Sequence, residues 1–405
     1  MEDSPGPGPE KGSGVADRSA ALLHERFPAL RERLPFVRLG EGPSPVRRLD
    51  VGGDEVWVKD EGAYGGPWGG NKVRKLEWVL PDVRRRRRRT VLTFGALGTN
   101  HGLATALYAR ELGLGAALAL VDQPVDDHVR VQLARLRKSG AALHFTHTRA
   151  RTVAALPWLL ARHASPLPPY VLPAGGSSPV GALGYVETAL ELAGQVEAGE
   201  LPEPAWAVVA VGTGGTAAGL ALGLRLAGLR TRVLAVVVND LLRLDGRVLS
   251  RLAGRSARLL RRRGAVLPNG AEVETADLTV TRDWLGAGYG RPTAESERAA
   301  AVAATAGLEL DPVYTAKAFA ALLGESAVGR LGGWAHPARA DARATRSSLR
   351  ACRRPCAWVG SEDNYDGGCE WLSWRDRRAR RSMRRSSRFG RPSRTSRRRP
   401  TGRAG

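Results

Sequence analysis

The amino-acid sequence predicts an α/β fold built on open, parallel sheets. Short apolar or β-branched runs alternate with longer segments of helical periodicity, which is the pattern of strand–helix–strand units. Runs such as AWAVVAV and RVLAVVV are apolar at nearly every position, as required of strands that are buried on both faces of a sheet. The length of 405 residues suggests two or three domains.

The individual elements follow from these runs in chain order. The predicted strands are Val91–Phe94, Ala116–Val121, Ala142–Phe145, Tyr170–Leu172, Trp206–Val211 and Arg232–Val238. The predicted helices are Asn100–Leu112, Asp126–Lys138, Val180–Ala198, Gly215–Ala227, Thr293–Thr305 and Pro312–Leu323. Ligands bind beyond the carboxyl ends of the strands in sheets of this kind, so functional side chains are expected there.

We expect neither a targeting segment at the start of the chain nor a membrane span. Residues 1–20 are acidic and rich in proline and glycine, so we expect a disordered leader rather than a signal or transit peptide. The longest nearly uninterrupted apolar run, Leu112 to Val121, falls short of the roughly 18 residues that a bilayer span takes. A cytoplasmic protein without membrane association is therefore expected.

The C-terminal segment 334–405 carries most of the net charge. It holds 20 arginines, no lysine and six acidic residues, which accounts for 14 of the 22 net positive charges. No helical or strand periodicity is visible, so we expect a disordered tail. One hypothesis is a basic arm that binds nucleic acid. The favoured hypothesis is a GC-rich gene read in a shifted frame after Gly333, which makes nucleic acid an unexpected partner. The three cysteines (Cys352, Cys356, Cys369) lack the spacing of a zinc site, and no metal is expected.

Lys72 is the residue that points most directly to a chemistry. Only six of the 62 basic residues are lysines, so lysine is retained where arginine cannot replace it. One such role is imine formation, because an amine can lose its proton and attack an aldehyde whereas a guanidinium stays charged. Lys72 follows Gly69, Gly70 and Asn71, and the two glycines let a bulky cofactor approach the backbone closely. The alternative is a surface lysine at the start of an amphipathic helix.

A glycine-rich turn follows the predicted strand Trp206–Val211. The sequence GTGGTAAG, Gly212 to Gly219, places backbone N–H groups at the start of a helix, where they and the helix dipole can hold a phosphate. The lysine of a GxxxxGK[ST] loop is missing, and GxGxxG spacing is absent too, which disfavours a nucleotide. A cofactor with one phosphate fits better, although a purely structural turn is the alternative.

Polar side chains follow other strand ends and helix starts. TFGALGTNHG offers Thr99, Asn100 and His101; Asn100 can donate to a ring oxygen, and Thr99 can relay a proton or cap the helix. GAGYGRPT and LDPVYTAKAF offer Tyr289 and Tyr314, as packing residues or as an acid/base set. A lysine, a cradle for one phosphate, an asparagine and a hydroxyl partner for a ring nitrogen together describe a pyridoxal phosphate site.

The same motifs resemble a known family. GGNKVRKLE, FGALGTNHG, AGGSSPVGALGYVETALEL, GTGGTAAG, GYGRPT and LDPVYTAKA occur in the order found in 1-aminocyclopropane-1-carboxylate (ACC) deaminases and D-cysteine desulfhydrases, over residues 24 to 325. The resemblance implies the tryptophan-synthase-β-like fold (fold type II), with pyridoxal 5'-phosphate in the cleft between two α/β domains. It also implies a homodimer, a larger cofactor domain (21–75 and 186–333) and a smaller domain (76–185).

The resemblance assigns roles to individual residues. Lys72 would bind the cofactor as an imine and then act as the base at Cα, Asn100 would bind the pyridoxal 3-oxygen, and the two tyrosines would line the substrate pocket. The implied catalytic residues are Lys72, Thr99, Tyr289 and Tyr314. The implied cofactor-binding residues are Lys72, Asn100, Gly212, Thr213, Gly214, Gly215, Thr216 and Thr315.

Thr315 favours one activity within the family. The deaminases place Glu after the tyrosine and the desulfhydrases place Thr. A hydroxyl leaves the pyridine nitrogen unprotonated, which suits elimination. The expected function is thus a lyase that releases ammonia and a 2-oxo acid from a small amino acid, by β-elimination as in D-cysteine desulfhydrase. One alternative is an ACC deaminase, which is a hydrolase. The other is a catalytically impaired scaffold with a nucleic-acid-binding tail.

Two departures from the family pattern affect these expectations. Thr99 replaces the family's serine and Ala96-Leu97-Gly98 a more polar run, which leaves the substrate and its chirality open. The family also ends with a buried apolar strand, and here the chain enters the arginine-rich tail instead. The last strand of the larger sheet is therefore expected to be missing, with a loss of solubility or of cofactor affinity.

Overall fold

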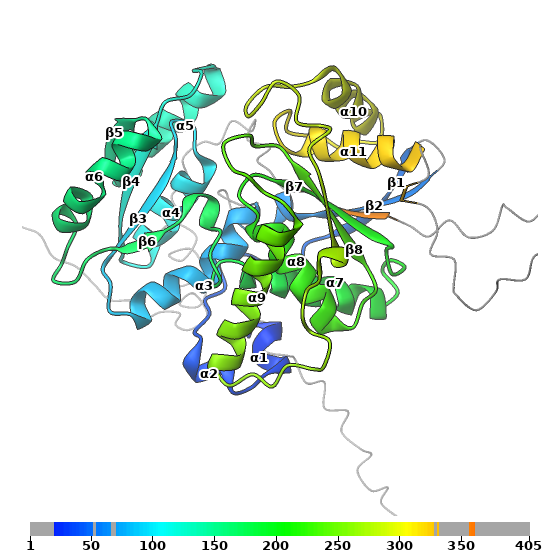
Figure 1. The fold of residues 1–405 in the computed structure, drawn as a ribbon, viewed down its shortest axis with the longest axis horizontal. Coiled ribbons are helices and arrows are strands. Elements are labelled where there is room, and N and C mark those ends of the chain that lie inside the picture. Colours follow the sequence, from blue (N-terminus) through cyan, green and yellow to red (C-terminus); the bar gives the residue numbers. More distant parts are fainter. Residues whose placement is uncertain (1–19, 52–53, 66–69, 328–329, 332–355, 361–405) are drawn as a thin grey trace, which may run out of the picture. The chain divides into compact units, whose positions relative to one another are not determined.

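The computed structural model describes residues 20–51, 54–65, 70–327, 330–331 and 356–360, whose strands form two sheets (Figure 1). The larger sheet has the order β1-β2-β10-β7-β8-β9, formed by β1 (Val46–Val51), β2 (Asp54–Asp60), β10 (Cys356–Gly360), β7 (Trp206–Val211), β8 (Arg232–Val237) and β9 (Leu278–Thr281). The smaller sheet has the order β5-β4-β3-β6, formed by β5 (Ala142–His147), β4 (Gly115–Val121), β3 (Thr90–Ala96) and β6 (Tyr170–Leu172). The strand pairs are parallel except for β1 and β2. The predicted fold class is confirmed.

The central strands of the larger sheet are buried on both faces, as their composition predicts. Along β7 and β8, alternate side chains belong to different hydrophobic clusters. Trp206 and Val208 pack with the helices α10 (Ala294–Thr305) and α11 (Thr315–Ala327). Ala207 and Val209 pack with α7 (Leu183–Glu197) and α8 (Gly215–Ala227) on the opposite face. Period-two alternation between two apolar layers explains why these strands read as continuous apolar runs.

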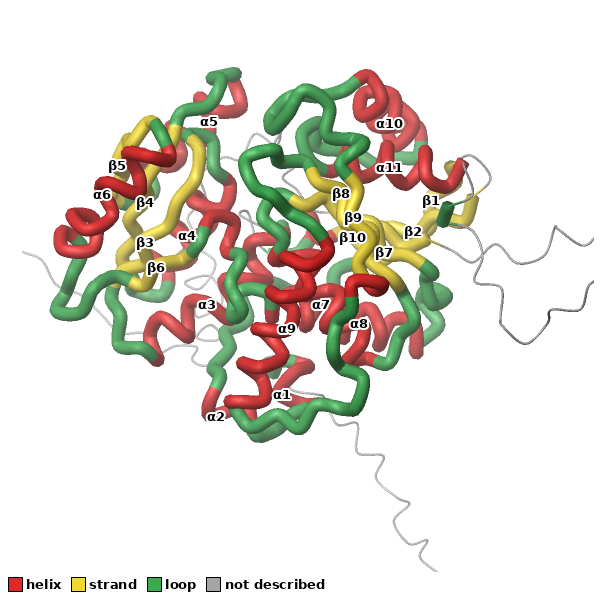
Figure 2. The backbone as a smooth tube through the Cα atoms, viewed as in Figure 1, coloured by secondary structure: helices red, strands yellow, loops and turns green. Residues whose placement is uncertain are grey.

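The smaller sheet is covered by helices in the same way (Figure 2). One face packs against α4 (Asn100–Glu111) and α5 (Asp127–Lys138), through Leu103 and Leu136 among others. The other face packs against α6 (Arg149–Arg162), where Leu159 meets Leu92. The remaining described helices are α1 (Leu22–Arg26), α2 (Leu30–Arg33), α3 (Asn71–Arg85) and α9 (Gly246–Arg262), with the short 3-10 turns η1 (Glu61–Ala63), η2 (Ala174–Gly176) and η3 (Thr275–Asp277).

The predicted strands and helices are all present, with shifted ends, but the prediction lacks α6, α9, β9 and the ribbon of β1 and β2. These two strands pair antiparallel, from Val46 opposite Lys59 to Val51 opposite Asp54. In β1, buried Leu49 and Val51 alternate with exposed residues. Alternation of this kind is typical of a strand with one covered face, whereas continuous apolar runs identify only strands buried on both.

The expectation that the larger sheet lacks its last strand is wrong. The strand β10, formed by CAWVG within the arginine-rich segment, lies between β2 and β7 and pairs parallel with both. Cys356 is opposite Val56 on one side and Trp206 on the other. Because the place between β2 and β7 is filled, the loss of solubility expected from a gap has no basis in the described sheet. The rest of segment 334–405, and residues 1–19 of the predicted leader, lie outside the described residues.

None of the described helices combines the length and the hydropathy that a bilayer crossing demands.

Candidate active site

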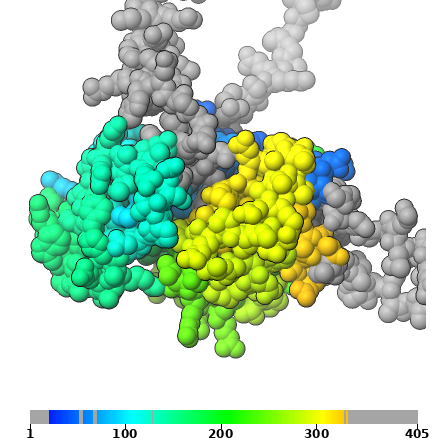
Figure 3. All heavy atoms as spheres, turned by 90° about the horizontal axis from the view of Figure 1, so that it is seen from above, coloured from blue at the N-terminus to red at the C-terminus, as the bar shows by residue number. Residues whose placement is uncertain are grey.

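A cavity of about 540 Å³ lies where the carboxyl ends of strands from both sheets meet the start of α3. Its wall includes the end of β3, the start of α4, the turn after β7, and two tyrosines, one from the loop before α10 (Ala294–Thr305) and one directly before α11 (Thr315–Ala327). In Figure 3 the atoms of the smaller-sheet segment, in cyan and green, lie beside a yellow group that includes the α10 segment. The cavity is where an open α/β sheet is expected to bind its ligand.

The wall contains most of the residues that the sequence predicts. Predicted residues in the wall are Lys72, Thr99, Asn100, Gly212, Thr213, Gly214, Thr216, Tyr289 and Tyr314. Gly215 and Thr315 do not line the cavity. Thr315 is 4% exposed at the start of α11, and its hydroxyl donates to the carbonyl of Asp311 at 3.2 Å. Its role towards a ring nitrogen therefore stays a prediction.

Lys72 lies in the first turn of α3, half-buried at the cavity wall. The helix begins after Gly70, whose φ of 91° is in the range that favours glycine. The Lys72 Nζ donates to Oδ1 of Asn71 at 2.5 Å. Gly70 thus allows a sharp turn of the chain directly before the helix, which places Lys72 at the cavity wall.

Lys75 is a second cavity lysine, and the sequence analysis assigned it no role. It is 3% exposed, and its Nζ donates to the carbonyl of Gly175 at 3.1 Å. A Cβ at Gly175 would lie 2.4 Å from Oγ1 of Thr213, so this carbonyl stands beside the glycine-rich turn. The available signal is the spacing: Lys72 and Lys75 are three residues apart and share one helix face.

The glycine-rich turn joins β7 to α8 as predicted. Gly214 has a φ of 90°, which favours glycine, and a Cβ there would lie 2.5 Å from the buried side chain of Leu249, which would have to shift. The turn is tied to Ser177, another residue that the sequence analysis left without a role. The Ser177 hydroxyl lies 2.6 Å from Oγ1 of Thr213 and accepts from the N–H of Gly215 at 2.9 Å.

The start of α4 presents Thr99 and Asn100. Thr99 caps the helix, because its Oγ1 accepts from the N–H of Gly102 at 3.1 Å. A Cβ at Gly95 or Gly102 would come within 2.7 Å of the Thr99 methyl, so these two glycines make room for the threonine. The Oδ1 of Asn100 accepts from the buried amide of Gln132 at 2.5 Å, which leaves the Asn100 amide nitrogen as a donor.

His101 is the next residue of α4 and is 3% exposed in the cavity wall. Its Nε2 lies 3.1 Å from the Thr93 hydroxyl, which itself donates to the carbonyl of Leu172. Nε2 therefore carries the proton, and Nδ1 is a buried acceptor with no hydrogen-bond partner among the described residues. Burial, followed by the charges of Lys72 and Lys75, lowers the pKa of His101 well below its usual value. The imidazole is neutral and acts as an acceptor.

Tyr289 and Tyr314 are in direct contact at the cavity wall. Their hydroxyl oxygens lie 2.7 Å apart, and their rings meet edge to face with centroids 5.8 Å apart. A hydrogen bond between two phenol groups lets a proton pass from one oxygen to the other. The pair is therefore suited to deliver or remove a proton within the cavity.

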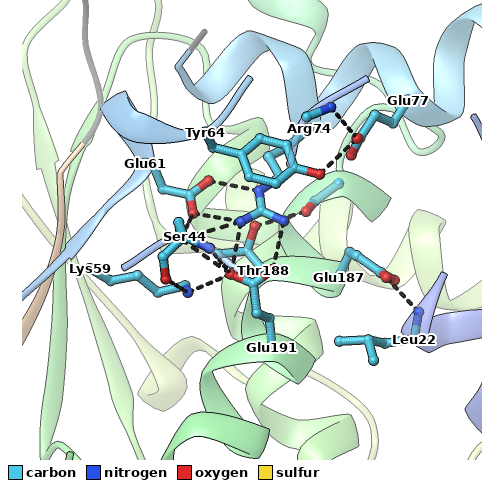
Figure 4. A network of polar contacts seen from close by, with 12 residues as sticks. Leu22, Ser44, Lys59, Glu61, Tyr64, Arg74, Glu77, Glu187, Thr188 and Glu191 are labelled. Carbon is cyan, nitrogen blue, oxygen red and sulfur yellow. Dashed lines mark hydrogen bonds and ion pairs between the residues drawn. The ribbon is translucent and has the colours of Figure 1, made fainter. Parts of the chain in front are cut away.

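A network of buried ion pairs fixes the start of α3 (Figure 4). Arg74 is fully buried and bonds Glu61 at 3.0 Å and Glu191 at 2.8 Å, while its guanidinium lies 3.3 Å from the centre of the Tyr64 ring. Lys59 reaches the same Glu191 at 2.6 Å. Burial alone would raise the pKa of Glu191, but Arg74 and Lys59 hold it well below its usual range. The network joins β2, η1, α3 and α7.

Comparison with known proteins identifies the family. The model of the family described as "Pyridoxal-phosphate dependent enzyme" matches residues 37–335. The chain belongs to this family of pyridoxal-phosphate-dependent enzymes. Relatives include the D-cysteine desulfhydrases of Salmonella paratyphi A and Salmonella newport (strain SL254), each 34% identical over 302 residues, which is 72% of this chain and 88% of the relative.

Solved structures agree with this assignment. A crystal structure of an ACC deaminase homologue is 28% identical, with a TM-score of 0.65, over 83% of this chain and 94% of that chain. A threonine deaminase from the organism abbreviated T.th. has a TM-score of 0.54 at 18% identity, over 86% of this chain and 100% of that chain. That second likeness concerns the fold alone.

The cavity fits pyridoxal phosphate. Lys72 supplies an amine at the wall, and the glycine-rich turn contributes Gly212, Thr213, Gly214 and Thr216 to the same cavity. Lys75 places a cation beside this turn, which suits a phosphate. Asn100 offers an amide donor, as a ring oxygen requires. The described residues of this pyridoxal-phosphate-dependent enzyme therefore offer groups that suit the aldehyde, the phosphate and the ring oxygen of the cofactor. The ring nitrogen is not matched among the residues that line the cavity.

Replacing Gly214 with alanine is expected to weaken cofactor binding. Gly228, at the other end of α8, is the matched control: its φ is 79° against 90° for Gly214, but nothing lies within 4 Å of its would-be Cβ. Both variants bear backbone strain of about 1–2 kcal/mol, but only at Gly214 would the new Cβ clash with a neighbour, so that the turn or the Leu249 side chain has to shift. We expect the pyridoxal phosphate Kd to rise at least about tenfold more for Gly214→Ala, or about 1.4 kcal/mol. Absorbance titration measures it, and equal Kd values would contradict the cradle.

Proposed function

We propose that this enzyme catalyses β-elimination from D-cysteine or a similar small amino acid, giving a 2-oxo acid and ammonia. The observation that carries the proposal is the placement of Lys72 and the two hydroxyls of Tyr289 and Tyr314 on one cavity wall, in a chain 34% identical to D-cysteine desulfhydrases. For cysteine, the C–S bond breaks and water is consumed, so that the products are hydrogen sulfide, pyruvate and ammonia.

The chain's own residues divide the work. Pyridoxal phosphate bound at Lys72 supplies an electron-withdrawing ring that makes the α proton of an amino acid acidic. Lys75 and the turn from Gly212 to Thr216 would hold the phosphate, and the Asn100 amide would hold the ring oxygen. The Lys72 amine takes the α proton. Its position in the first turn of a helix that is anchored by buried ion pairs keeps the amine in place.

The two tyrosines serve the leaving group. A thiol leaves more easily when a proton reaches the sulfur as the C–S bond breaks. The Tyr289 and Tyr314 hydroxyls lie 2.7 Å apart. One of them can supply that proton, and the other can then pass its own proton to the first. Thr99, fixed as a helix cap, positions its hydroxyl at the wall next to Asn100.

A substrate panel tests this function. We expect D-cysteine to be consumed with release of sulfide and pyruvate in equal amounts, with kcat/KM at least about tenfold above that for ACC. L-cysteine, D-serine and β-chloroalanine, assayed in parallel, establish the chirality and the leaving group. Rapid 2-oxobutyrate release from ACC without sulfide release from cysteine would reverse the assignment. The ACC deaminase homologue at 28% identity makes that the second candidate.

We further propose that the enzyme works in the cytoplasm as a homodimer, as the family resemblance implies. Light scattering at two protein concentrations would show a mass twice that of the 43.3 kDa chain. Nucleic-acid binding by the arginine-rich segment stays a separate hypothesis. Because β10 ends at Gly360, a deletion that tests it on random DNA has to begin after that residue.

A further inference from the structure

The loop that carries Tyr289 has little stiffness of its own. Gly286, Gly288 and Gly290 all have positive φ angles of 65°, 121° and 77°. A chain of alternating glycines in such conformations has many accessible states when it is not held. The Tyr289 hydroxyl nevertheless lies within 2.7 Å of Tyr314. Contacts from outside the loop therefore have to fix its backbone.

Lys317 makes two of these contacts. It lies in α11 and is 0% exposed. Its Nζ donates to the carbonyl oxygen of Leu285 at 2.8 Å and to that of Gly288 at 3.3 Å. Burial lowers the pKa of Lys317, and the charges of Asp240 and Asp311 act in the opposite direction. The ammonium thus holds two backbone carbonyl groups, those of Leu285 and Gly288, in the first half of the loop.

Asp240 holds the same loop from the other side. It follows β8, and its Oδ1 accepts from the N–H of Tyr289 at 3.1 Å. A Cβ at Gly288 would lie 3.0 Å from Oδ2 of Asp240, so the loop backbone is in close contact with this carboxylate. The loop is held between a cation on α11 and an anion after β8.

The residue type at 317 is informative. The sequence has 56 arginines and six lysines, and two of those few lysines, Lys59 and Lys317, are at most 1% exposed. An ammonium is compact and donates in three directions, whereas a guanidinium is planar and larger. Two carbonyl oxygens from one tight loop, at 2.8 and 3.3 Å, suit the ammonium.

We propose that Lys317 is a positioning residue that acts through Tyr289: with Asp240, it clamps the loop from Leu285 to Gly290 and so holds the Tyr289 hydroxyl against that of Tyr314. Tyr314 and Lys317 are three residues apart in the sequence, so the start of α11 supplies both the partner of Tyr289 and the anchor of its loop. The inference rests on the proposed function only for the chemical consequence. The clamp itself concerns only the backbone conformation of the loop and does not depend on the reaction.

The test compares Lys317→Met, Tyr289→Phe and the double variant in the full-length, cofactor-loaded protein. Lys138→Met, at an exposed lysine at the end of α5, is the matched control. Amide hydrogen exchange in the segment 284–291 is expected to accelerate at least about tenfold in Lys317→Met, and exchange in α3 to stay unchanged. The cofactor absorbance is expected to persist. The kcat for elimination is expected to fall as far as in Tyr289→Phe, and the double variant to be no slower than Tyr289→Phe alone.

Two results would overturn the proposal: unchanged exchange in segment 284–291, or losses in kcat that multiply in the double variant. If the wild type turns over no amino acid, the proposed function fails and hydrogen exchange alone decides the clamp. If Lys317→Met does not fold, Asp240→Ala replaces it in each comparison. Asp240 is exposed, so its removal tests the clamp with little cost to the core.

Discussion

Replacement of Lys72 by alanine is expected to abolish the covalent link to the cofactor and to lower kcat by on the order of a thousandfold or more. Lys72 lies in the first turn of α3 at the cavity wall, and in the proposed function its amine both binds the cofactor and takes the α proton. The wild-type protein should be yellow, because the lysine-bound cofactor absorbs violet light, and borohydride should bleach this colour and fix the cofactor to the chain. The variant should show neither property.

Lys75→Ala separates the two cavity lysines. Lys75 lies beside the glycine-rich turn, so its loss should raise the Kd for pyridoxal phosphate while borohydride still fixes the bound cofactor to the chain. A Lys72→Ala protein that keeps a borohydride-stable link would contradict the assignment. Mass spectrometry of the reduced protein then identifies the lysine that is modified.

Replacement of Arg74 by methionine is expected to lower the free energy of unfolding by about 3–5 kcal/mol, because the loss of one member of a buried ion network leaves its partners uncompensated. Glu61 and Glu191 both bond Arg74, and all three side chains are at most 8% exposed. The network also fixes the helix that carries Lys72. Denaturant unfolding, followed by far-UV circular dichroism, measures the change.

The exposed pair of Arg130 and Asp127 provides the control. These side chains are 67% and 95% exposed and lie 2.8 Å apart, so the geometry is similar while the surroundings differ. Arg130→Met is expected to cost at most about 1 kcal/mol. Equal costs for the two variants would show that burial does not decide the strength of the network around Arg74.

The sequence could predict those parts of the fold and the site that depend on local pattern. The strand Trp206–Val211, the helix Gly215–Ala227 and the glycine-rich turn between them are where the sequence places them, because continuous apolar runs, helical periodicity and glycine each reflect a local constraint. The scarcity of lysine identified Lys72. The same signal extends further than expected, since Lys59, Lys75 and Lys317 are also buried.

Contacts between distant segments decided the rest, and a local pattern carries no record of them. CAWVG becomes β10 because β2 and β7, some 300 and 150 residues earlier, leave a place between them. Ser177 gains its role only when the turn of Thr213 folds onto it. Thr315 follows the tyrosine as the desulfhydrase pattern requires, yet its hydroxyl bonds the carbonyl of Asp311. The sequence by itself determined the family, the cofactor chemistry and the order of the elements, because those depend on residue types in a fixed order. The tertiary structure alone decided which side chains meet at the cavity, because hydrogen bonds and packing between segments far apart in the chain depend on how the two sheets bring them together.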